Sequence, residues 1–90
     1  EGRFLVRSQK EVWGEILAAK AAASPEYAET LKDTGTEYLV EFDRGAKRQG
    51  AAGHPPFWTG MVDDDGTLHG QNFMGRCQMR LRAELAEENA

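Results

Sequence analysis

The residues best suited to bind a ligand surround an asparagine near the end of the sequence. Asn72 stands before apolar residues at positions 74, 77, 81 and 85, and this three- and four-residue spacing predicts a helix with one buried stripe. An asparagine side chain can cap the unpaired N–H groups of a helix start. Gly70 and Gly75 flank it and let another group approach the backbone closely. Such a helix start attracts an anion or a nucleotide, although the same residues also fit a plain capped helix of the core.

An aromatic side chain provides a second candidate contact for a ligand. Trp58 lies between Phe57 and the pair Thr59-Gly60. Because the nearby glycine leaves the indole face open, we expect this ring, rather than Trp13 of the first predicted helix, to stack on a planar group. Trp13 is predicted to lie in the core.

Acidic residues and histidines elsewhere do not predict a metal site. The run Asp63-Asp64-Asp65-Gly66 is similar to the opening of a calcium loop, but the twelfth position of such a loop would be Met74 instead of glutamate. A solvated turn explains the run better. His54 and His69 have neither zinc-site spacing nor a recognisable catalytic triad around them. The sequence therefore predicts no metal and no cofactor.

The composition narrows the class of protein. With 90 residues the chain is one small domain at most, and a net charge of −4 with no basic stripe excludes non-specific binding to nucleic acid. The single Cys77 has no partner for an internal disulfide and is predicted to be a buried apolar residue. No apolar run is long enough to cross a membrane, and no signal peptide is recognisable. These features predict an intracellular protein.

Two further helices have clear start and stop signals. Ser8-Gln9-Lys10-Glu11 is a capping box that predicts a helix to about Ala23. Ser24-Pro25 predicts the start of a second helix, because serine caps and proline fits the first turn, and Asp33-Thr34-Gly35 predicts its end.

The remaining segments predict short strands and loops. Residues 2–7 fit a short strand or an extended lead-in, and the β-branched and aromatic residues of 36–42 predict a strand. Residues 43–56 lack periodicity and are predicted to form a loop. Residues 57–62 and 67–69 are predicted to pair as a hairpin around the acidic turn. The expected fold is mainly α with one or two short strands, in a single domain over residues 1–90.

Five pieces of the sequence, in order, resemble the second half of the NADAR (YbiA-like) domain, and the resemblance covers residues 11–85. It implies a NADAR-like helical fold that lacks its N-terminal part. The pieces are Thr34-Gly35, Leu39-Val40-Glu41, Trp58-Thr59-Gly60, Gly70-Gln71-Asn72-Phe73-Met74-Gly75 and Met79-Arg80-Leu81-Arg82.

Members of this family are N-glycosidases, which cleave the bond between ribose and an amine nitrogen in riboflavin-pathway intermediates or in ADP-ribosylated guanine. This hydrolysis passes through an oxocarbenium-like state that a carboxylate can stabilise. The resemblance implies that Trp58 stacks on the base, that Asn72, with Gly70 and Gly75, contacts the ligand, and that Asp43 is the catalytic carboxylate.

The chain also departs from the family. The family's essential glutamate lies in the first half of the domain, which this chain lacks, and a long glycine-containing loop separates Asp43 from Trp58. Two functions follow. One is a reduced relative that acts as a non-catalytic interaction or assembly subunit, with a vestigial nucleotide-type pocket and a protein partner or oligomer covering its apolar helix faces. The alternative is an N-glycosidase for a ribose- or ADP-ribose-containing small molecule, completed by a missing N-terminal half.

Overall fold

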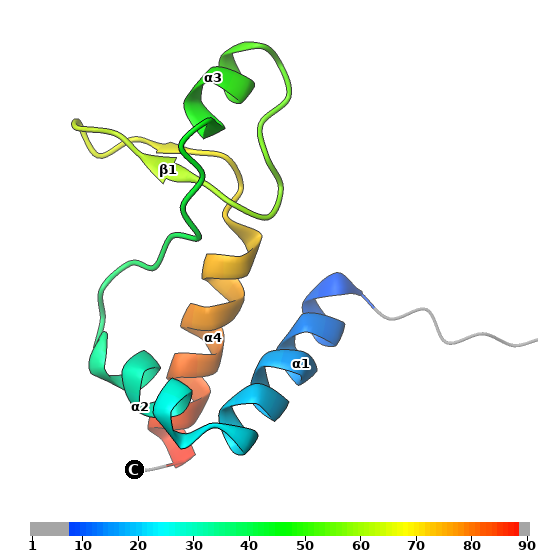
Figure 1. The fold of residues 1–90 in the computed structure, drawn as a ribbon, viewed down its shortest axis with the longest axis vertical. Coiled ribbons are helices and arrows are strands. Elements are labelled where there is room, and N and C mark those ends of the chain that lie inside the picture. Colours follow the sequence, from blue (N-terminus) through cyan, green and yellow to red (C-terminus); the bar gives the residue numbers. More distant parts are fainter. Residues whose placement is uncertain (1–7, 89–90) are drawn as a thin grey trace, which may run out of the picture.

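The computed structural model describes residues 8–88, which form four helices and one two-stranded sheet (Figure 1). The mainly helical fold with a short hairpin is therefore confirmed. The segment 2–7, predicted as a strand or lead-in, lies outside the described residues. In chain order the elements are α1 (Gln9–Ala23), α2 (Pro25–Asp33), α3 (Ala46–Ala51), β1 (Met61–Val62), β2 (Leu68–His69) and α4 (Phe73–Glu88).

Helices α1 and α2 begin at the predicted caps. The Ser8 hydroxyl oxygen accepts the backbone N–H of Glu11 at 3.2 Å, and the Ser8 hydroxyl donates to the Glu11 carboxylate at 3.3 Å. Ser24 accepts the N–H of Tyr27 at 3.3 Å in the same way. After α2 the chain turns through Gly35, whose φ of 62° is costly for other residues. Local capping therefore fixes the bounds of both helices.

The hairpin is confirmed, but the other two β and loop predictions are partly wrong. Strands β1 and β2 pair antiparallel around the acidic turn, with Met61 opposite His69. The predicted strand over residues 36–42 is reduced to one parallel bridge between Phe42 and Gly60. The predicted loop over residues 43–56 contains α3. Its start is organised by Asp43, whose carboxylate accepts the N–H of Gly45 at 2.9 Å.

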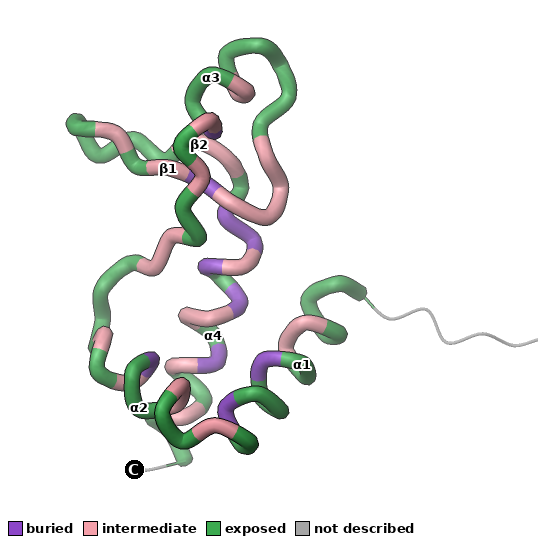
Figure 2. Tube along the Cα trace, in the orientation of Figure 1, coloured by how far each residue is buried: buried purple, intermediate pink, exposed green. Residues whose placement is uncertain are grey.

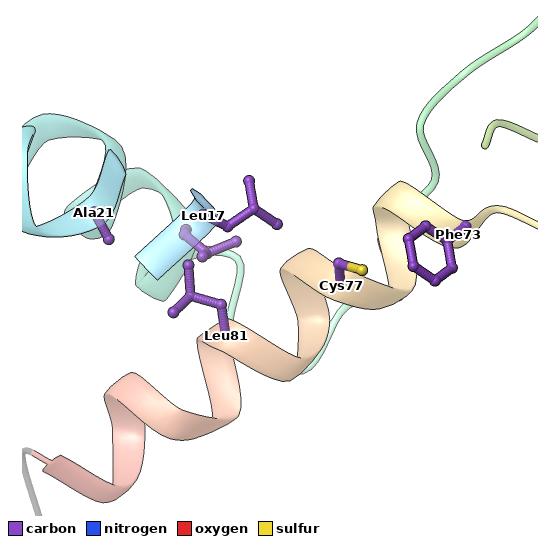
Figure 3. Packing of buried hydrophobic residues seen from close by; sticks show 6 residues of the cluster. Leu17, Ala21, Phe73, Cys77 and Leu81 are labelled. Atoms are coloured by element: carbon purple, nitrogen blue, oxygen red, sulfur yellow. The ribbon is translucent and has the colours of Figure 1, made fainter. Parts of the chain in front are cut away.

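The core lies along the contacts between the three longer helices. Figure 1 shows α1 and α4 running in the same general direction, close together beside α2 and splayed apart toward their N-termini. In Figure 2 the buried residues form a stripe along α4 and the lower half of α1. α4 has buried residues one turn apart on this stripe (Figure 3). The cluster of buried core residues comprises Leu17, Ala21, Leu31, Phe73, Cys77 and Leu81.

The molecule is flat and open. Its principal extents are 45, 39 and 19 Å, and its radius of gyration is 15.5 Å. A compact chain of this length has a radius of gyration of about 12 Å. The splayed helices explain the difference, because they do not close around a central core. Between residues 8 and 88, no helix combines the length and apolar character needed to cross a bilayer.

Candidate functional site

Asn72 is completely buried, and its side chain binds another segment of the same chain. The Oδ1 atom accepts the N–H of Glu41 at 2.9 Å, and Nδ2 donates to the carbonyl of Leu39 at 2.8 Å. Its φ is 52°, a left-handed conformation that asparagine tolerates better than most residues. The side chain therefore fastens residues 39–41 to the start of α4. This bonding also explains why those residues do not form a strand ladder.

The backbone at the start of α4 is also engaged within the protein. Carbonyl groups of residues 56–59 accept the N–H groups of residues 71–74, at distances between 2.8 and 3.1 Å. These are the N–H groups that were predicted from the sequence to bind an anion. Because the segment 56–59 already uses them, they are not free to hold a phosphate in this arrangement.

The glycines around Asn72 allow a close approach, but the approaching groups belong to the protein. A Cβ atom at Gly75 would overlap the Asn72 amide and the Leu39 carbonyl oxygen. A Cβ atom at Gly70, where φ is 88°, would lie 2.6 Å from the carbonyl oxygen of Thr59. Both positions therefore require glycine for packing.

Trp58 belongs to a cluster of four aromatic rings. Its ring centroid lies 5.6 Å from that of Trp13, 5.0 Å from that of Phe57 and 5.3 Å from that of Phe73, all in edge-to-face geometry. Phe57 and Phe73 are stacked at 4.8 Å. Both tryptophans are half-buried and pack against the core. Trp58 thus joins α1 to the start of α4.

Asp43 is held in place by two hydrogen bonds. One carboxylate oxygen accepts the Gly45 N–H at 2.9 Å, and the other accepts the Thr59 hydroxyl at 3.0 Å. These bonds, with that of Gly45 the largest cause, lower the pKa of Asp43 below its ordinary value. The carboxylate is therefore ionised at neutral pH. It lies beside Thr59, the residue that follows Trp58.

The five predicted site residues thus either belong to the segment 56–60, contact it, or contact a residue that does. Asp43, Gly70 and Asn72 contact Thr59, while Trp58 is part of the segment. Gly75 packs against the amide of Asn72. Together these residues connect the hairpin region to the start of α4 through hydrogen bonds and close packing.

A cavity of about 450 Å³ lies elsewhere, between α1 and α4, and we call it the α1/α4 groove. Its volume falls in the range of ligand pockets, about 300 to 1,000 Å³. None of the five predicted site residues lines it. Its lining combines three core side chains of α4, small residues of α1 and charged side chains, in full Phe73, Cys77, Leu81, Gly14, Ala18, Lys10, Glu11, Glu15, Arg76, Arg80 and Glu84.

One pattern in the sequence indicates the groove. Gly14 and Ala18 are four residues apart, so they lie on the same face of the first helix and leave little side-chain bulk there. Inside the groove, burial raises the pKa of the Cys77 thiol, while the nearby cations Arg76 and Arg80 act in the opposite direction. The thiol is therefore mainly protonated at neutral pH and is a poor nucleophile.

A second, smaller cavity of about 200 Å³ lies between α2, the segment 39–41 and α4. Gln78 bridges its walls, because its Oε1 accepts the Tyr27 hydroxyl at 3.4 Å and its Nε2 donates to Glu41 at 3.3 Å. Its volume is below the usual range of a nucleotide-sized site. We therefore regard the α1/α4 groove as the candidate functional surface.

The chain matches no protein-family model, no curated protein and no solved structure. The resemblance to the NADAR domain therefore stays a prediction.

Proposed function

We propose that this chain is a non-catalytic interaction or assembly subunit, a reduced NADAR-like domain whose open side is covered by a protein partner. One observation carries the proposal. Phe73, Cys77 and Leu81 belong to the core cluster and at the same time line the α1/α4 groove. The core of this small domain is thus continuous with an open surface.

Covering this surface stabilises the chain. Each Å² of apolar surface removed from water contributes about 25 cal/mol to stability. Small domains bury a smaller fraction of their surface than large ones, so this contribution is important for them. The outer side of α1 adds apolar surface, since Val12 is 36% and Ile16 46% exposed. Val12 and Ile16 are one helical turn apart, and exposed apolar side chains that share a face are typical of protein interaction sites.

Site-directed photo-crosslinking tests the proposal in cells. A benzoylphenylalanine at position 10 suits this test, because Lys10 lines the groove and is exposed, so the probe reaches an occupant without filling the space at Gly14. The matched control carries the same group at Ala51, an exposed residue of α3. We expect irradiation to join the position-10 chain, and not the control, to a second protein chain. Only uncrosslinked chain from both positions would contradict the proposal.

The hydrolase remains the alternative, and Asp43 is the observation in its favour. Its ionised carboxylate is fixed beside Thr59 and thus near Trp58, as a group that stabilises an oxocarbenium-like state would need to be. The test is incubation with ADP-ribose derivatives and ribosylamino-pyrimidine phosphates. Base release that disappears in Asp43→Asn would support the alternative. No release, even after a polypeptide that corresponds to the first half of a NADAR domain is added, would exclude it.

A further inference from the structure

We propose that the partner in the α1/α4 groove is helix α1 of a second copy of this chain. The inference rests on the proposed function and names the occupant of the same groove. Two copies would then place α1 and α4 of each chain together as a four-helix arrangement.

The charges of the two groove walls complement each other at matched spacing. The α1 wall carries Glu11 and Glu15, and the α4 wall carries Arg76 and Arg80, so each pair is one helical turn apart. If α1 of a second copy enters the groove, its two glutamates can face the two arginines. In a two-fold symmetric pair the same contacts form twice.

The outer charges of the walls favour an antiparallel register. With Glu15 of one copy opposite Arg76 of the other, and Glu11 opposite Arg80, Lys10 falls within one turn of Glu84. A parallel register would bring Glu11 opposite Arg76 and leave Lys10 far from Glu84. Glu84 forms an ion pair with Arg80 of its own helix, at 3.5 Å, and both side chains are more than half exposed. Such an exposed ion pair contributes little stability, so Glu84 can leave Arg80 and pair with Lys10 of the second copy.

The shape of the groove also fits a helix. Gly14 and Ala18 leave the α1 wall without bulk, and packed helices need an interaxial distance of about 8–10 Å. The cavity of about 450 Å³ between α1 and α4 lies on this side of both helices. A helix with the small residues of α1 therefore fits better than one with large side chains.

A charge-swap experiment tests the identity of the occupant. The acidic variant is Arg76→Glu with Arg80→Glu, and the basic variant is Glu11→Arg with Glu15→Arg. Either variant alone places like charges across the interface, so its dimer dissociation constant should rise at least about tenfold. An equimolar mixture restores opposite charges in both grooves and should restore the dimer. Sedimentation velocity measures all three samples.

The control variant is Glu87→Arg with Glu88→Arg, which changes exposed charges of α4 outside the groove and should leave the dimer unchanged. Because Glu11 also belongs to the cap at Ser8, Glu15→Arg alone is the second test variant, and circular dichroism checks that each variant is folded. A wild-type monomer, or a mixture that fails to associate, would overturn the inference. If the position-10 crosslink then joins a different protein, the proposed function survives and only the second copy is excluded.

Discussion

Gly75 lies directly against the side-chain amide of Asn72, so that a Cβ atom at position 75 would overlap both Oδ1 and Nδ2. The same atom would overlap the Leu39 carbonyl oxygen. The absence of a side chain at position 75 therefore allows the buried amide to reach residues 39–41. This pair of residues holds the middle of the chain against α4.

Gly75→Ala should destabilise the protein, although alanine is ordinarily the better helix residue. The added methyl group must displace the backbone of Leu39 or the buried amide, and overpacking of this kind costs about 1–3 kcal/mol. Urea unfolding measures the change. Gly14→Ala is the control, because its Cβ meets open space and the substitution should stabilise α1 by about 0.5–1 kcal/mol. Equal gains at both positions would refute the close contact.

Asn72→Ala should remove the side-chain hydrogen bonds that connect α4 to the segment 39–41. It removes the hydrogen bonds to the Leu39 carbonyl and the Glu41 N–H, and each such bond contributes about 0.5–1.5 kcal/mol. Urea unfolding gives the total loss, and hydrogen exchange should show a less protected Glu41 amide. Gln71→Ala, at the exposed neighbouring position, should change stability by less than about 0.5 kcal/mol. A loss as small as that of the control would contradict the role of Asn72.

The sequence predicted the elements whose signals are local. Ser8 and Ser24-Pro25 cap their own helices, and the turn at Asp63–Gly66 joins two adjacent strands, so nearby residues contain the information. Helix α3 was missed because its residues, Ala46–Ala51, have no apolar periodicity. It forms where the Asp43 carboxylate organises the preceding turn, a contact that hydrophobic patterning does not reveal.

The candidate site was harder to predict because its contacts are distant in sequence. Asn72 was predicted to cap the helix or to contact a ligand, but the side-chain partners that the structure shows lie 31 and 33 residues earlier in the chain. The residues next to Asn72 in the sequence are the same whether its side chain caps the helix or bonds to a distant segment, so they do not distinguish the two roles. Likewise the groove depends on the angle between α1 and α4, which α2 and the ring of Trp58 help to set.

The pairing of Asp63 with His69 predicts a dependence of stability on pH. The Asp63 Oδ2 atom lies 2.7 Å from His69 Nε2, and hydrogen bonding with Asp65 first and His69 second lowers the pKa of Asp63 far below its ordinary value. A lowered folded-state pKa stabilises the folded protein above the unfolded-state value, about 3.9, and this contribution is lost as the pH falls below it.

Urea unfolding between pH 7 and pH 2 checks this with Asp63→Asn. We expect the variant to be less stable than wild type at pH 7 and the difference to shrink as the solution is acidified below about pH 4. Asp64→Asn, at the exposed next position, serves as the control and should follow wild type. A difference between Asp63→Asn and wild type that stays constant down to pH 2 would show that the carboxylate charge is not involved.

Cys77 should react slowly with thiol reagents in the native protein. Burial raises its pKa, so little thiolate is present near neutral pH, and the core covers the sulfur atom. We expect the rate of modification at pH 8 to be at least about tenfold lower than for the same chain in urea. Because Cys77 lines the groove, the native rate should fall further as protein concentration rises and the groove fills. Native and unfolded chains that react equally fast would show that the sulfur is not covered.

Sedimentation equilibrium of the wild type and Gly14→Leu, over the same range of concentrations, tests the central claim that the α1/α4 groove is an interface between two copies of this chain. The leucine side chain enters open space, so it should fill the groove without disturbing the fold, which circular dichroism verifies. We expect the wild-type mass to rise from 10.0 kDa toward twice that value, while Gly14→Leu stays at about the mass of one chain. A wild type that remains at 10.0 kDa throughout, or a leucine variant that associates equally well, would contradict the account.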